Sequence, residues 1–143
     1  MSPPKTIFPL IILALTFATA SGQSERTPSP EGARVYIISP SDGDTVSNPV
    51  TVRFGLHGMG VAPAATDAQN TGHHHLLIDA KSLPELDKAI PSDETHRHFG
   101  GGQTEATLEL APGKHTLQLL LGDKFHIPHD PPIISEKVTI TVK

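Results

Sequence analysis

The chain has 143 residues, of which 11 are basic, 15 are acidic and nine are histidine, and it contains no cysteine. Its net charge of −4 with neutral histidines and its lack of a basic patch argue against nucleic acid as a partner, because phosphate backbones are bound by clustered lysine and arginine. Disulfides and thiolates are excluded, so any metal ligands have to be imidazole, carboxylate, methionine or backbone groups.

The first 20 residues have the pattern of a secretory signal peptide. Lys5 gives a positive start, residues 7–18 form an apolar run, and Ala18-Thr19-Ala20 matches a small-x-small cleavage site. The run is shorter than the roughly 20 apolar residues that a membrane-spanning helix needs. We therefore expect cleavage after Ala20, and a mature protein that is periplasmic or secreted and makes no membrane contact. An uncleaved anchor is the alternative.

Residues 21–33 are polar and contain proline and glycine, which predicts a disordered lead-in. The remaining segment, 34–143, has a suitable length for one domain with a single core. We therefore expect one folded domain after the signal peptide and the lead-in.

Beyond residue 33, apolar and polar side chains alternate in short segments that proline and glycine separate. This alternation has the period of a half-buried strand. It predicts strands at 35–38, 50–56, 73–79, 105–110, 114–121 and 134–142. With one further short strand near 82–90, the chain would form an all-β, immunoglobulin-like antiparallel β-sandwich of about seven strands.

Most of the histidines lie in three tight groups, at 73–75, at 96 and 98, and at 126 and 129. Imidazole titrates near neutrality and is a common nitrogen ligand for copper and zinc. His73 and His75 point to the same side of a predicted strand, about 7 Å apart along it. A solvent-facing polar surface is the alternative interpretation of this pair. His126 and His129 lie in a loop that three prolines stiffen.

Whether these groups can meet depends on the path of the chain between residues 79 and 105. A strand near 82–90 would bring three loops to the same end of the sandwich, because successive antiparallel strands alternate in direction. That end would gather His57, His73, His75, His96, His98, His126 and His129. Without the strand, His57 and the 73–75 group would face the end opposite to the other four. The sequence leaves both arrangements open.

His74 and His115 are interpreted differently, because each lies in the apolar row of its predicted strand. We expect His74 to be a core histidine bonded to a backbone carbonyl, and His115 to be structural. Asp123, Asp130 and Glu105 could orient imidazoles as hydrogen-bond acceptors, or could be solvated loop carboxylates.

Four motifs carry a family resemblance, and they occur in the order GHHHLLID (72–79), HFGGGQTE (98–105), PGKHTLQL (112–119) and GDKFHIPHDPP (122–132). Together they resemble the DUF4399 family, small exported bacterial domains of unknown function. The resemblance covers most of residues 34–143 and implies an exported, immunoglobulin-like domain with no assigned activity. His57 and His96 lie outside the motifs, which makes them weaker candidates.

The leading hypothesis is a periplasmic module that binds a copper or zinc ion through three or four nitrogens. The candidate ligands are His73, His75, His98, His126 and His129. The lack of thiolates favours Cu(II) or Zn(II), although Met59 leaves Cu(I) open.

One alternative is a non-catalytic adhesion or assembly module whose histidine-rich rim binds an unknown protein, a glycan or an anion. A less favoured alternative is a metal-dependent enzyme. Removal of Lys5 with the signal peptide would change the net charge from −4 to −5, which gives no hint of an electropositive channel that steers substrate.

Overall fold

The computed structural model of the protein describes residues 26–143, so the predicted signal peptide and residues 21–25 lie outside the described residues. The strands are β1 (Arg34–Ser39), β2 (Thr45–Val46), β3 (Val50–His57), β4 (Gly60–Val61), β5 (Thr71–Ile78), β6 (His96–His98), β7 (Glu105–Leu108), β8 (Gly113–Gly122) and β9 (Val138–Val142). In this part of the chain, no helix is long and apolar enough to cross a membrane.

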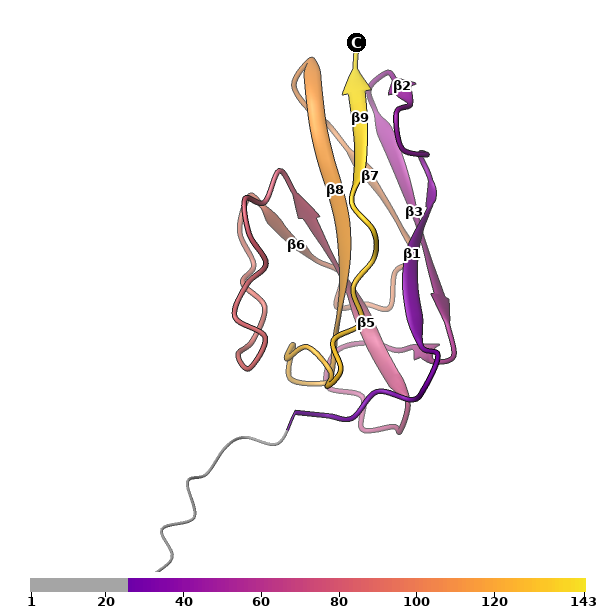
Figure 1. The fold of residues 1–143 in the computed structure, drawn as a ribbon, viewed down its shortest axis with the longest axis vertical. Helices are drawn as coiled ribbons and strands as arrows, with labels where there is room; N and C mark the ends of the chain where they lie inside the picture. Colours follow the sequence, from indigo (N-terminus) through magenta and orange to yellow (C-terminus); the bar gives the residue numbers. More distant parts are fainter. Residues whose placement is uncertain (1–25) are drawn as a thin grey trace, which may run out of the picture.

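The strands form two sheets that pack face to face (Figure 1). The smaller sheet has the order β1-β3-β7, and the larger has the order β2-β9-β8-β5-β4 with β6 added beside β5. The short strands β2 and β4 pair in parallel with β9 and β5, and the other pairs are antiparallel. The predicted all-β sandwich is therefore confirmed.

The core between the sheets is built by the apolar rows that the sequence shows. Val52 and Phe54 of β3 face Leu76 of β5 and Leu119 of β8, and all four side chains are buried. Burial of side chains of this size contributes about 1.5–3 kcal/mol each relative to exposure. The alternating pattern thus defines the inner face of each sheet.

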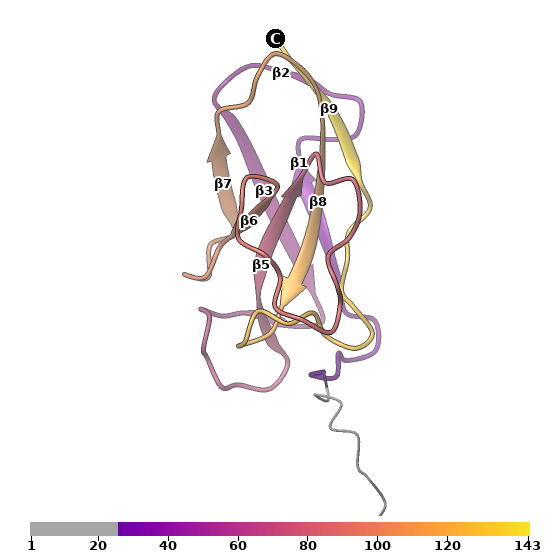
Figure 2. The same ribbon diagram turned by 90° about the vertical axis from the view of Figure 1, so that its left-hand side faces the viewer.

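Strand β5 differs from the half-buried strand that its alternation predicts, because it is buried on both faces. Its outer face carries Leu77, which packs with Leu120 of β8 and Ile90 in a second apolar cluster. Ile90 belongs to the long segment between β5 and β6, and this segment folds back over the outer face of the larger sheet (Figure 2). Consequently the odd-numbered side chains of β5 are also shielded from water.

One strand does lie between β5 and β7, but at His96–His98 rather than near 82–90. β6 runs antiparallel to β5, with His98 opposite His75. The segment 82–90 forms an irregular loop instead, since it contains Pro84 and lacks a regular alternation. β8 is also antiparallel to β5. The start of β5, the end of β6 and the loop after β8 therefore lie at the same end of the sandwich.

The N-terminal strap, residues 26–29, belongs to the folded domain, in contrast to the predicted disordered lead-in. Pro28 forms a bridge with Asp130, and backbone hydrogen bonds join Ser29 N–H to the Asp130 carbonyl and Asp130 N–H to the Thr27 carbonyl. The composition of the strap is polar and therefore predicted disorder. It could not show the ordering contacts, because the loop after β8 that supplies them lies about 100 residues away in the sequence.

The last strand is shorter than the predicted segment 134–142, because β9 begins at Val138. Residues 133–135 still run beside β8, where Leu121 N–H donates to the Ile133 carbonyl and Ser135 N–H to the Leu119 carbonyl. The chain leaves this pairing at residues 136–137 and then rejoins the sheet.

His74 lies on the inner face of β5 with 0% of its surface exposed, and its ring packs against Phe54 with centroids 5.1 Å apart. Its burial in the core is as predicted. The predicted bond to a backbone carbonyl is wrong, since neither ring nitrogen has a hydrogen-bond partner among residues 26–143. The ring is held by apolar packing, and its unpaired nitrogens lower the stability of the domain.

Substitution His74→Leu should stabilise the domain at pH 7, because leucine has a similar size and leaves no buried polar group. A buried unsatisfied group costs about 1–3 kcal/mol, so we expect a gain of about 1 kcal/mol in the free energy of unfolding, measured by urea denaturation. The exposed His57 at the end of β3 gives the control: His57→Leu should change stability by less than about 0.5 kcal/mol. Destabilisation by His74→Leu would contradict this account of the core.

Candidate metal centre

Two ligand candidates come from the outer face of β5. His73 and His75 each have 1% of their surface exposed, and their ring centroids are 4.8 Å apart. Gly122 of β8 lies opposite His73 in the sheet register. A Cβ atom on Gly122 would approach Cε1 of His75 to 2.7 Å, so the absence of a side chain there makes room for the His75 ring.

Two further imidazoles reach this pair from other elements. His98, at the end of β6, is exposed and lies beside His75 in the register, with ring centroids 5.1 Å apart. His126, in the loop after β8, is half-buried, and its Nδ1 lies 3.0 Å from Nε2 of His73. The rings of His98 and His126 are in turn 4.7 Å apart. Four imidazoles from three segments therefore meet at one end of the sandwich.

The dimensions of this four-histidine cluster suit a single ion. Each of His73, His75, His98 and His126 offers one ligand nitrogen, and these nitrogens lie within 4.8 Å of one another. Zn–N bonds of about 2.0–2.1 Å place the nitrogens of a tetrahedral site about 3.3 Å apart. The 3.0 Å separation between His73 and His126 is already close to that value. Small side-chain movements would bring the other nitrogens into range.

The surroundings keep the inner imidazoles neutral. Burial, followed by the neighbouring imidazoles, lowers the pKa of His73 to about 4 and that of His75 to about 3. Burial and then His126 also lower the pKa of His98. A neutral imidazole keeps a lone pair for a metal, whereas an imidazolium has none. At neutral pH the buried imidazoles of the cluster therefore have lone pairs that could coordinate a cation.

The fifth predicted ligand, His129, lies outside the cluster. It is 0% exposed, and neither ring nitrogen has a hydrogen-bond partner within the described chain. Burial lowers its pKa, while the nearby Asp123 carboxylate opposes this effect. His129 therefore packs into the end of the sandwich, apart from the four histidines whose ligand nitrogens come together.

The remaining histidines also have separate environments. His57 is exposed at the end of β3. His115 bonds to Asp79 and to the Ala111 carbonyl, at 2.7 Å each, and these bonds raise its pKa. These bonds join β8 to the residue that follows β5 and to the turn before β8, in keeping with the predicted structural role.

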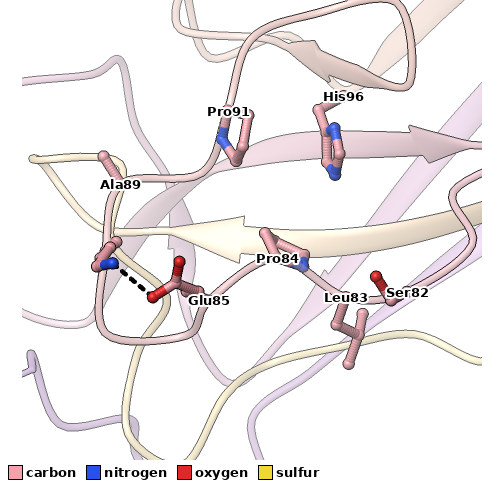
Figure 3. Close-up of a pocket in the computed structure, with 8 residues that line it drawn as sticks. Ser82, Leu83, Pro84, Glu85, Ala89, Pro91 and His96 are labelled. Carbon is pink, nitrogen blue, oxygen red and sulfur yellow. Dashed lines mark ion pairs between the residues drawn. The ribbon is translucent and has the colours of Figure 1, made fainter.

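His96 lines a pocket of about 380 Å³, which is formed mainly by the loop between β5 and β6. Its Nδ1 bonds to Asp93 at 2.9 Å, and its ring lines the pocket together with Ser82 and Glu85 (Figure 3). Glu85 is paired with Lys88 at 2.6 Å. His96 is not a member of the four-histidine cluster, although it lies two residues before His98.

The three carboxylates considered as imidazole acceptors have other partners. Glu105 pairs with Arg53, and Asp130 with Arg26. Asp123 accepts hydrogen bonds from the backbone N–H groups of Phe125 and Ile127, at 2.8 and 3.0 Å. Aspartate side chains often accept a hydrogen bond from the backbone N–H two residues ahead. The presence of Asp123 in this loop could therefore have predicted the turn at Phe125.

The fold and the cluster together define a small all-β domain with four histidines that could hold a metal ion. A family model described as a domain of unknown function, DUF4399, matches residues 52–143. The chain belongs to this family, and all four cluster histidines lie within the matched segment. Neither the curated proteins nor the solved structures contain a match to this chain.

The lowered pKa values predict that the metal-free domain loses stability in acid. In the unfolded chain these histidines take up protons near pH 6.5, whereas folded His73 and His74 remain neutral to about pH 4 and His75 to about pH 3. The unfolded state therefore binds more protons between these limits. The free energy of unfolding should fall by about 1 kcal/mol per pH unit for each histidine as the pH drops from about 6.5 to 4.

Urea denaturation in the presence of a chelator at several pH values measures this slope. The double variant His73→Gln/His75→Gln should show a smaller slope, because two of the four buried imidazoles are gone, while His74 and His129, whose pKa values burial also lowers, remain. His115, whose pKa is raised, contributes in the opposite sense and adds stability below its folded pKa. A stability that stays constant between pH 7 and 4.5 would contradict the assigned protonation states.

Proposed function

We propose that this protein is an exported module that binds one divalent transition-metal ion, copper or zinc, in the periplasm or outside the cell. The observation that carries the proposal is the convergence of His73, His75, His98 and His126, whose ligand nitrogens lie within 4.8 Å of one another. The signal-peptide pattern of residues 1–20 supports the expected location.

The composition of the cluster favours a transition metal over other ligands. The group contains imidazoles and no carboxylate among the described residues, whereas calcium and magnesium require oxygen ligands. An anion would need imidazolium groups, but the pKa values of His73 and His75 are about 4 and 3. Copper(II) and zinc(II) are among the ions whose preference for neutral nitrogen ligands matches this set.

The exposure of the ligands suggests how an ion would enter. His73 and His75 lie at the bottom of the cluster, while His98 is exposed and His126 half-exposed. An ion arriving from solvent would meet the outer pair first and then reach the buried pair. The buried pair provides a rigid base, since β8 flanks both residues in the sheet.

Isothermal titration with Cu(II) and Zn(II) tests the proposal. The mature domain should bind one ion per chain, and His98→Ala or His126→Ala should weaken binding by about 100-fold or more, because loss of a direct ligand costs at least as much as loss of an outer partner. These two positions are preferred because their replacement disturbs the core least.

The matched control is His57→Ala, since His57 is exposed and lies outside the cluster. This variant should bind like the unchanged protein. Equal weakening by all three substitutions would indicate non-specific surface binding and would overturn the proposal.

Metal binding should also raise the thermal stability of the domain. An ion that binds the folded state alone, at 100 times its dissociation constant, adds about 2.7 kcal/mol. The melting temperature should therefore rise on addition of the preferred ion and fall back with excess chelator. The chelated domain should remain folded, because the core of Val52, Phe54, Leu76 and Leu119 does not include the cluster. Complete unfolding by the chelator would argue for a different role of the metal.

A further inference from the structure

The backbone at His126 is held in an uncommon conformation. Its φ angle is +67°, a left-handed value that side chains other than glycine adopt rarely and at some cost. Its N–H donates to the Asp123 carbonyl at 2.9 Å, and its carbonyl accepts from Ile90 N–H at 2.8 Å. The ring can bond to His73 because the surrounding loop imposes this turn.

Asp123 is the centre of that loop. Its side chain is 4% exposed, and its Oδ1 accepts from the N–H groups of Phe125 and Ile127, the residues on either side of His126. Its Oδ2 accepts from the hydroxyl of Thr27 at 2.6 Å. A buried carboxylate needs such partners on both oxygens, because an unpaired buried charge is strongly unfavourable.

The N-terminal strap also binds the later part of the same loop. Arg26 donates through Nε to the Pro128 carbonyl at 3.0 Å and also bonds to the His129 carbonyl. It lies 3.6 Å from the Asp130 carboxylate. The hydroxyl of Ser29 donates to the Pro131 carbonyl at 2.8 Å. The strap therefore contacts the loop from Asp123 to Pro131, which carries His126.

We infer that the strap is part of the metal centre and that Thr27 is a positioning residue, which acts through Asp123 to place the His126 ligand. This inference rests on the proposed function. Thr27 supplies the hydroxyl that donates to Oδ2 of Asp123. Without it the carboxylate turns toward water, the N–H bonds around His126 weaken, and the left-handed turn relaxes. The cluster then retains three imidazoles in place of four.

Substitution Thr27→Val removes the hydroxyl and keeps the shape of the side chain, whereas Thr27→Ser keeps the hydroxyl. Thr27→Val should weaken Cu(II) or Zn(II) binding by about 10–100-fold, the usual effect of losing an outer partner of a ligand. Thr27→Ser should bind within a few-fold of the unchanged protein. Electron paramagnetic resonance of the Cu(II) form should show one fewer nitrogen ligand in Thr27→Val, which a general loss of stability would not produce.

A double-mutant cycle separates positioning from simple destabilisation. If Thr27 acts through His126, Thr27→Val should have no further effect on affinity in a His126→Ala background. Additive losses, or an unchanged affinity and spectrum of Thr27→Val, would overturn the inference while the unchanged protein still binds metal. Failure of the unchanged protein to bind either ion would instead overturn the proposed function, and the metal-site role of the strap with it.

Discussion

Strand β5 is buried on both faces, and this constraint determines the protonation state of its three consecutive histidines. Its inner face belongs to the core and its outer face is covered by loops, so none of the three rings can reach bulk water. Water is the medium in which an imidazolium is stable, and its exclusion disfavours charge at all three positions. The strand therefore holds neutral imidazoles at a pH where exposed histidines are partly protonated.

The same strand also positions the other two histidines of the cluster, His98 and His126. Because β6 and β8 both run antiparallel to β5, both finish near its beginning. His98 is fixed by sheet pairing, while His126 depends on a turn that distant residues stabilise. The cluster thus combines a rigid half, built on the sheet, with a half that is sensitive to its supporting loop. If the proposed metal site exists, this division predicts that substitutions in the loop change metal affinity more than fold stability.

The sequence predicted the elements that local pattern controls. Alternation in 50–56 and 114–121 gave β3 and β8, because one row of each of those strands lies in the core. It did not predict the burial of both faces of β5 or the three-residue strand β6, because each depends on packing against segments far away in sequence. Four of the five candidate ligands meet. His129 does not, since the loop that follows the turn at His126 is bound to the strap, and no local pattern shows that contact.

The boundary of the family match has a practical consequence. The match begins at residue 52, inside β3, but β1 precedes it and covers one edge of β3 in the smaller sheet. A fragment trimmed to the matched residues would retain every cluster histidine and would expose the central strand as an open edge. Unpaired edges of this kind recruit strands from other molecules, so such a fragment would tend to self-associate and aggregate.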